Sequence, residues 1–451
     1  MSDEQLPGQG QEKVAAEPLE PLEPGQIPGQ QVPEPTEADP AAATSDGDSR
    51  WSGVLREIVS GSATISVLAV VLAMVAGAVL IALTNENVQT AAGYFFARPG
   101  DTFSAIWDAV SGAYSSLFQG SIYNFNRPDF ATGIRPLTET LNFATPLVAA
   151  GLGVALGFRA GMFNIGGRGQ MLFGAAAAGW VGFSFDLPPG IHLALALAAG
   201  IIAGAIWGGL AGLLKARTGA HEVIVTIMLN YVAFYLISYM LRTPGLLQAP
   251  GSNNPKSAAM HANSVFPRLL GPQYNLTIGF LLVIAATVVV WWILNRSSLG
   301  FQFRAVGENP NAARVAGINV KSVYILAMLI SGALVGMAGA NQVQGVITSG
   351  FTSGIDAGIG FDAITVALLG RSRPWGTFWA AILFGAFKAG GFTMQAAQSI
   401  PIDIVLVVQS LIVLFIAAPP LVRAVFRLPK PLEVPKVRKP SNASKKRTVT
   451  S

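Results

Sequence analysis

Residues 190–214 read GIHLALALAAGIIAGAIWGGLAGLL, and this stretch combines two features that decide the fold. It contains no Asp, Glu, Lys or Arg, and a bilayer core roughly 30 Å thick needs about 20 apolar residues in one helix. Its glycines Gly200, Gly204, Gly208 and Gly212 recur every four residues, so they share one face of a helix. Small faces allow helices to pack closely in lipid. The stretch therefore predicts a membrane-spanning helix that packs within a bundle.

The rest of the chain repeats the first of these features. It is 51% hydrophobic and only 12% charged, with a mean hydropathy of +0.50, whereas a soluble protein is about 25% charged. We therefore expect an all-α, polytopic membrane protein with about ten transmembrane helices. The expected spans are 62–83, 137–158, 168–185, 190–214, 222–241, 275–294, 321–341, 375–396 and 401–418, with a shorter run at 355–370 that is either a tenth span or a re-entrant half-helix.

The basic residues indicate the orientation of these spans. With a cytoplasmic N-terminus, the short outer loops at 186–189, 342–354 and 397–400 carry no Lys or Arg, while every inner loop carries at least two. Cytoplasmic loops of membrane proteins are enriched in these residues, so we expect both termini to be cytoplasmic. Spans 2–5 then start outside and spans 7–10 start inside, which permits an inverted repeat.

The two ends of the chain differ from the transmembrane domain expected at 57–420. Residues 1–50 carry eleven acidic and two basic residues, eight prolines and no aromatic residue. Such a composition cannot bury enough apolar surface to fold, so 1–56 is predicted to be a disordered cytoplasmic tail. The tail at 421–451 carries nine basic residues against Glu433, which suits contact with the anionic lipid of the inner leaflet.

Several chemistries are excluded by composition. The chain has no Cys and three scattered His, and no second His follows His221-Glu222 at the spacing of a zinc protease. No Gly-x-x-x-x-Gly-Lys-Ser/Thr phosphate loop occurs. We therefore expect no catalytic residue, metal or cofactor in this chain, and no nucleic-acid partner; any ATP must be bound by another subunit.

Few ionisable groups lie at membrane depth, namely Glu139, Glu222, Asp362, Lys388 and Asp403. A charge at the bilayer centre costs on the order of 3 kcal/mol, so such groups usually pair or face a cavity. Asp362 and Lys388 lie deepest, in neighbouring spans, and are the candidates for an intramembrane ion pair. The same two residues support an alternative function, a proton-coupled secondary transporter of a small polar solute.

Three segments break the apolar pattern. The first, FRAGMFNIGGRGQ at 158–170, combines four glycines with Asn164 and Gln170. Non-helical backbone at membrane depth is tolerated only when it is buried in protein or lines a wet cavity. A tight cytoplasmic turn between the second and third spans explains this segment nearly as well.

The second segment is GAHEVIVTIMLNY at 219–231, at the start of the fifth span. Glu222, Thr226 and Asn230 are spaced at i, i+4 and i+8, which places them in one polar stripe along a helix. This stripe either lines a path for a hydroxylated solute or forms hydrogen bonds with a neighbouring helix.

The third segment is GFQFRAVGENPNAARVAG at 300–317, in an inner loop. Asn309 is a favourable N-cap, Pro310 suits the first helical position, and Gly317 suits the C-terminal stop. They predict a two-turn helix over 309–316, which is too short to persist alone. A capped cytoplasmic helix of this kind needs a partner to dock against. The charged residues around it are Arg304, Glu308 and Arg314.

Together the three segments resemble the permease subunits of bacterial ABC importers for nucleosides and simple sugars. The pattern of that family is similar to Phe-Arg-Ala-Gly-Leu-Phe-Asn-Ile-Gly with Gly-Gln, then Glu-Val-Ile with Thr-Ile-Met-Leu-Asn-Tyr, then Arg-Ala-Val-Gly-Glu-Asn-Pro. The matching residues are Phe158–Gly166 with Gly169-Gln170, Glu222–Tyr231 and Arg304–Pro310. The first segment is nearer to the nucleoside-type branch than to the ribose-type branch, which reads Gly-Gly-Ile-Asp-Leu-Ser. The chain departs from many relatives at Arg168, where they carry an acidic residue. The resemblance extends over about 137–418.

The resemblance implies a transport function, a set of partners and a bacterial plasma-membrane location. The 309–316 helix would be the coupling helix that enters a groove of a cytoplasmic ATPase, with Arg304, Glu308, Asn309, Pro310 and Arg314 at the contact. The partners would be that ATPase, a second permease subunit (identical or homologous) and an extracytoplasmic substrate-binding lipoprotein. The candidates for the substrate pathway are Asn164, Gln170, Glu222, Thr226 and Asn230.

Overall fold

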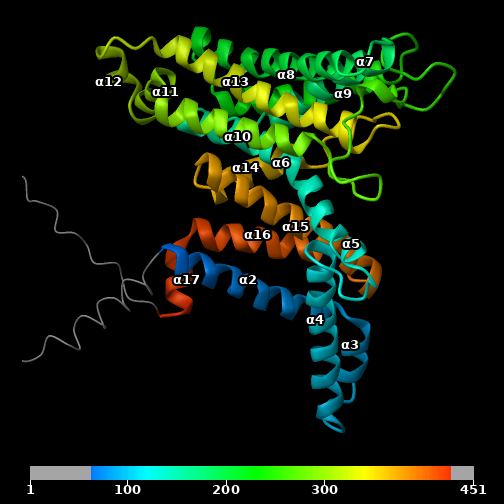
Figure 1. The fold of residues 1–451 in the computed structure, drawn as a ribbon. Coiled ribbons are helices and arrows are strands. Elements are labelled where there is room, and N and C mark those ends of the chain that lie inside the picture. Colours follow the sequence, from blue (N-terminus) through cyan, green and yellow to red (C-terminus); the bar gives the residue numbers. More distant parts are fainter. Residues whose placement is uncertain (1–61, 428–451) are drawn as a thin grey trace, which may run out of the picture. The chain divides into compact units, whose positions relative to one another are not determined.

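The computed structural model describes residues 62–427, and within that part the chain is helical, with a single isolated β-bridge between Arg268 and Thr277. The predictions for the tail at 1–56 and for most of the tail at 421–451 lie outside the described residues. Each of the ten expected runs is a helix (Figure 1), which confirms an all-α polytopic membrane protein. The ten helices are α2 (Ser62–Thr84), α6 (Arg135–Arg159), α7 (Gly167–Ser184), α8 (Ile191–Thr218), α9 (Glu222–Met240), α10 (Gly279–Arg296), α13 (Val320–Asn341), α14 (Ile359–Leu369), α15 (Pro374–Gln398) and α16 (Ile402–Ala417).

The ten helices are not ten equivalent spans. By length and apolar composition, six segments of the described chain could cross a membrane: α2, α6 with the short helix before it, α8, α9, α10 and α13. α14 has 11 residues, which at 1.5 Å per residue span about 16 Å, roughly half of the bilayer core. The shorter run at 355–370 is therefore a half-helix in length. α16 is also short and apolar, with 16 residues.

The segment between the first two spans is not a plain loop. It contains α3 (Glu86–Ala92), α4 (Pro99–Ser121) and α5 (Phe130–Gly133). α4 buries small residues, including Ala109, Ala113 and Gly120, and contacts α15. A Cβ on Gly120 would lie 3.0 Å from the Cα of Gly390. The helical spacing of these small residues is the signal that could have predicted α4.

The remaining described helices are short. They are α11 (Ser298–Glu308), α12 (Pro310–Val315), α17 (Pro419–Val425), the 3-10 turn η2 (Ala262–Ser264) and the π-helical turn η3 (Gln342–Val346). α17 occupies the beginning of the region expected to be the basic C-terminal tail, and it contacts α2 and α16. The packed part of the chain therefore extends several residues beyond 420.

The glycine face of α8 packs against α13, and the two helices lie side by side (Figure 1). A Cβ on Gly204 would lie 2.5 Å from the carbonyl oxygen of Gly332, and one on Gly208 would lie 2.7 Å from that of Met328. The backbones touch, and no side chain fits between them. The close helix packing predicted from the glycine spacing is confirmed.

The helix contacts follow the pattern that an inverted repeat requires. If α6–α9 correspond to α13–α16, the α8–α13 contact corresponds to a contact between α15 and α6, which is also extensive. There, a Cβ on Gly385 would lie 2.5 Å from the carbonyl oxygen of Thr140. The first residues of α7 and α14 also meet, because a Cβ on Gly167 would lie 2.8 Å from the carbonyl oxygen of Gly360. Two helices that begin at the same point from opposite repeats are typical of such folds.

Candidate functional site

The three segments singled out in the sequence meet in the folded chain. The loop at 160–166, between α6 and α7, contacts both of the others. Gly161 has a φ of +69°, and a Cβ there would lie 3.0 Å from the Cα of Gly307 on α11. On the other side, Asn230 Nδ2 of α9 donates to Ile165 O at 2.8 Å, and its Oδ1 accepts from Gly169 N at 2.8 Å. The loop therefore joins the segment at 300–317 to α9.

A buried polar network holds this loop in place. The side chains of Asn164 and Gln170 form a reciprocal amide pair, with both N···O distances 3.0 Å. Asn164 Nδ2 also donates to Ser331 Oγ of α13 at 2.8 Å, and its Oδ1 accepts from Gly166 N at 2.9 Å. Ser331 in turn donates to Gly153 O of α6 at 2.7 Å. All three side chains are at most 1% exposed, and such satisfied networks rigidify a core.

The polar stripe of α9 belongs to the same interior. Glu222, Thr226 and Asn230 are all buried, and Thr226 Oγ1 donates to Glu222 O at 2.8 Å within its own helix. Of the two alternatives for this stripe, the structure favours hydrogen bonding inside the protein. The same holds for Asn164 and Gln170. The polar atoms of these five residues have hydrogen-bond partners within the chain, and their place along a substrate pathway stays a prediction.

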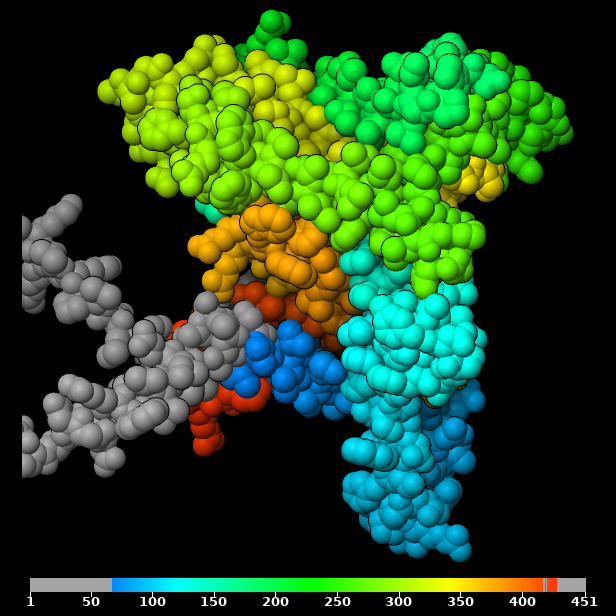
Figure 2. All heavy atoms as spheres, viewed as in Figure 1, coloured from blue at the N-terminus to red at the C-terminus, as the bar shows by residue number. Residues whose placement is uncertain are grey.

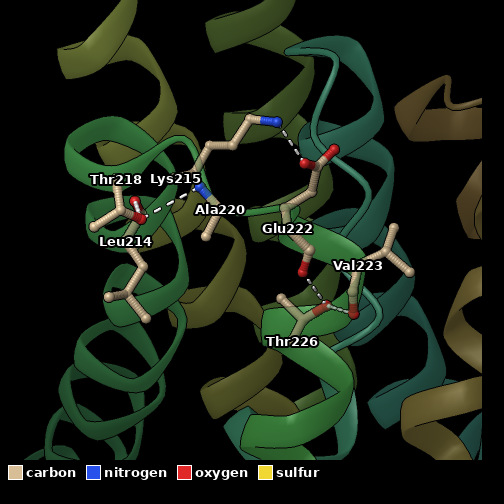
Figure 3. Close-up of polar contacts among 7 residues, drawn as sticks. All are labelled: Leu214, Lys215, Thr218, Ala220, Glu222, Val223 and Thr226. Atoms are coloured by element: carbon tan, nitrogen blue, oxygen red, sulfur yellow. Dashed lines mark hydrogen bonds and ion pairs between the residues drawn. The ribbon is translucent and has the colours of Figure 1, made fainter.

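Glu222 has a partner that the sequence reasoning missed. Lys215 Nζ, at the end of α8, donates to Glu222 Oε2 at 2.6 Å (Figure 3). The turn between them is fixed by Gly219, whose φ is +72°, and by Thr218, whose Oγ1 accepts from Ala220 N at 3.3 Å. The side chains of Lys215 and Glu222 are 25% and 8% exposed. Opposite charges on either side of a short glycine turn were the signal that could have predicted this pair.

The segment at 300–317 contains the capped helix that the sequence predicts. Asn309 is extended and its Oδ1 accepts from Asn311 N at 3.0 Å and from Ala312 N at 3.1 Å. The helix that follows, α12, begins at Pro310 and has six residues. It ends at Val315, with Ala316 as its C-cap, and Gly317 follows with a φ of +81°, as a C-terminal stop of this kind requires. The element is confirmed; its docking role is not decided by geometry alone.

α11 and α12 have one buried side, and the end of α12 is exposed. α11 buries Phe303 and Val306 completely, and α12 buries Ala313. Val315, in contrast, is 91% exposed at the end of α12. The exposed polar residues around it are Glu308, Asn309 and Arg314. Arg304 points elsewhere, because its guanidinium donates to the carbonyl oxygen of Leu294 on α10.

Asp362 and Lys388 share a cavity but do not form the expected ion pair. They line a space of about 260 Å³ between α14, α15 and α16, together with Phe384 and Gln409. Lys388 Nζ donates to Ala357 O at 3.3 Å, in the bend before α14. Among the described side chains, only Arg168–Asp356 and Lys215–Glu222 lie within 4.0 Å as ion pairs. The ammonium has a backbone acceptor instead of the carboxylate.

Arg168 and Asp356 form the ion pair that the sequence did not predict. The Arg168 Nε lies 3.3 Å from Asp356 Oδ1, and its guanidinium carbon lies 4.6 Å from the centre of the Phe234 ring. Arg168 is in the first turn of α7, and Asp356 precedes α14. The pair therefore joins the starting points of the two corresponding helices. No sequence spacing could indicate it, because the partners are 188 residues apart.

Comparison with known proteins agrees with this architecture. The model of the family "Branched-chain amino acid transport system / permease component" matches residues 137–417. The guanosine ABC transporter permease protein NupP of Bacillus subtilis is 36% identical over 358 residues, which are 78% of this chain and 92% of that protein. The nucleoside ABC transporter permease protein NupB of Lactococcus lactis is 34% identical over 69% of this chain and 86% of that protein. The glucose ABC transporter permease protein TsgB13 of Haloferax volcanii is 36% identical over 62% of this chain and 75% of that protein.

No solved structure matches this chain. The family match nonetheless covers both halves of the helix repeat and all three motif segments, and the helices are those of a multi-pass plasma-membrane protein. The chain belongs to the branched-chain amino acid transport system permease family and is the transmembrane permease subunit of an ABC importer.

Proposed function

We propose that the cargo of this permease is a nucleoside. The support is the nucleoside-type form of the segment at 158–170 and the names of two relatives, a guanosine permease and a nucleoside permease. The glucose permease among the relatives makes a simple sugar the other candidate. The partners are a cytoplasmic ABC ATPase, a second permease subunit and an extracytoplasmic binding lipoprotein, and both termini of the chain are cytoplasmic.

The second part of the proposal is that α12 docks into the ATPase. The observation that carries it is Val315, an apolar side chain 91% exposed on a helix held by caps at both ends. An isolated six-residue helix would not be stable in water, and a single exposed apolar side chain of this kind suits a small pocket on a partner. Glu308, Asn309, Pro310 and Arg314 would surround the contact.

The packing offers a route for the movement. α12 follows α11 directly, and Gly307 of α11 lies against the backbone of Gly161. The loop that contains Gly161 is hydrogen bonded to Asn230 of α9. A displacement of α12 by the ATPase would therefore reach the start of α7 through a backbone contact and the middle of α9 through the side chain of Asn230.

Transport assays in energised vesicles test the cargo and the energy source together. Uptake of labelled guanosine should require ATP and the ATPase subunit and should persist in the presence of a protonophore. Uptake that stops with the protonophore and needs no ATPase would instead support proton coupling through Asp362 and Lys388. Competition by unlabelled glucose, but not by other nucleosides, would assign the cargo to the sugar class.

The docking role is tested by changing the tip of α12 alone. Val315→Asp should lower cargo-stimulated ATPase activity at least tenfold, because it places a charge in an apolar contact. Val315→Leu is the matched control and should retain most activity. Glu308→Lys should also uncouple hydrolysis from uptake while the protein stays inserted. Normal transport by Val315→Asp and Glu308→Lys would refute the docking role.

A further inference from the structure

A cavity with an unusual lining lies where α10 ends and α15 begins. Its volume is about 650 Å³. Figure 2 shows the surface of α10 and α11, in yellow-green, beside that of the segment around α14 and the start of α15, in orange. Its lining includes three arginines, two tryptophans and a leucine: Arg159, Arg304, Arg373, Trp291, Trp375 and Leu294.

Three arginines converge on this cavity, and no carboxylate lines it. None of the three has an acidic group within 4.0 Å among the described side chains. Arg159 uses its Nε for Ser372 O at 3.0 Å, and Arg304 uses one nitrogen for Leu294 O. Arg373 is exposed. Each guanidinium has five N–H donors, so most of them remain available. Three like charges in one cavity repel each other unless an anion lies among them.

The same cavity has an indole rim. Trp291 and Trp375, in its lining, are 37% and 40% exposed, and their neighbours Trp292 and Trp379 are 55% and 64% exposed. Tryptophan is enriched where a membrane protein passes from hydrocarbon to headgroups, because its ring is apolar and its N–H is polar. Arginines in the same lining as these tryptophans would therefore lie at the depth of the lipid phosphates.

We propose that this cavity binds the headgroup of an anionic phospholipid of the inner leaflet, such as phosphatidylglycerol. The guanidiniums of Arg159, Arg304 and Arg373 donate to the phosphate oxygens in the bidentate geometry that arginine favours. The acyl chains run along Trp291 and Trp375. The proposal rests on the cytoplasmic orientation proposed above, which places this end of α10 in the inner leaflet. Basic pockets between membrane helices on that side are suited to anionic headgroups.

Lipid retention by the purified full chain tests the site. Protein reconstituted in nanodiscs of phosphatidylcholine with a minor fraction of phosphatidylglycerol is released and analysed by native mass spectrometry. The wild type should retain phosphatidylglycerol over phosphatidylcholine. Arg373→Gln should lower that affinity about fivefold, the expected effect of one basic residue at an anionic surface. Arg371→Gln, which removes the same charge from the same loop but does not line the cavity, should lower it much less.

Each other result has a defined meaning. Equal losses in the two variants, or no preference for phosphatidylglycerol in the wild type, would overturn the proposal. Thermal stabilisation by inorganic phosphate in pure phosphatidylcholine nanodiscs, with no further gain from phosphatidylglycerol, would show a phosphate site and overturn the lipid assignment. Protection of Arg373 from chemical modification only when the ATPase is bound, and not by phosphatidylglycerol, would assign the cavity to the ATPase instead. The assay uses no cargo and no ATP, so its failure is distinct from failure of the transport proposal.

Discussion

The starting points of α7 and α14 lie against each other, yet their surroundings are built in opposite ways. At α7, Asn164 and Gln170 are fully bonded, and α9 contributes Asn230 to the backbone of the loop. Near the start of α14, α16 takes the place that α9 has at α7. It contributes Gln409 to a cavity of about 260 Å³. Among the described side chains, Gln409 makes no hydrogen bond, although it is only 8% exposed. One end is closed by polar pairing and the other is open.

This difference indicates which half of the molecule can rearrange. Regions with few internal contacts open at lower free energy than fully packed ones. The α7 end is fixed to α6, α9 and α13 by hydrogen bonds and to α11 by backbone contact. The α14 end has space and two separated charges. We therefore expect the first repeat to transmit movement as a unit and the second repeat to change shape around its cavity.

The largest expected effect concerns the glycine contact between α8 and α13. Gly204→Leu would add a side chain whose Cβ alone would lie 2.5 Å from Gly332 O. We expect the free energy of unfolding to fall by about 3 kcal/mol or more. The measurement is size-exclusion chromatography after detergent extraction, in which the monodisperse peak should disappear. Gly100→Leu is the control, because a Cβ there meets no atom within 4 Å. A monodisperse, thermally stable Gly204→Leu protein would show that the contact is not tight.

The second prediction compares the two corresponding amides. Asn230→Leu leaves Gly169 N and Ile165 O without their partners and should destabilise the protein by about 3 kcal/mol, since each buried unsatisfied group costs about 1–3 kcal/mol. Gln409→Leu should cost much less, because it breaks no hydrogen bond. Thermal unfolding in detergent measures both. Equal losses would remove the distinction between the closed and the open end.

The third prediction addresses the link between the two ends. Arg168→Leu leaves Asp356 without its ion partner. Asp356 is only 4% exposed, so we expect a loss of about 2 kcal/mol, less than for a fully buried pair because Arg168 is 28% exposed. The exchanged variant, Arg168→Asp with Asp356→Arg, should recover part of this loss in the same unfolding assay. A double variant less stable than both single ones would argue against a direct pair.

The smallest expected effect is the coupling between Asp362 and Lys388 in the open end. Since they are not in contact, a double-mutant cycle with Asp362→Asn and Lys388→Met should give a coupling energy below about 1 kcal/mol. The same cycle with Lys215→Met and Glu222→Gln should give a larger coupling energy, because Lys215 Nζ and Glu222 Oε2 lie 2.6 Å apart in the wild type. Strong coupling between Asp362 and Lys388 would mean that the cavity closes and that the ion pair forms in another conformation.

The helices could be predicted from the sequence. The ten apolar runs, the glycine face of α8 and the caps of α12 were all readable, because apolar length, helical spacing and capping depend on residues close together in the chain. Even the missed helix α4 left such a local trace in its small residues.

The pairing of the polar groups, in contrast, depends on how the helices pack in three dimensions. The stripe on α9 was visible, but whether Asn230 faces a solute or a neighbouring backbone depends on a loop 65 residues away. Asp362 and Lys388 were plausible partners by sequence, whereas the observed partner of Asp356 is Arg168, from the other repeat. In lipid, a polar side chain bonds to whichever group the helix packing brings within reach, and that packing is set by the whole bundle.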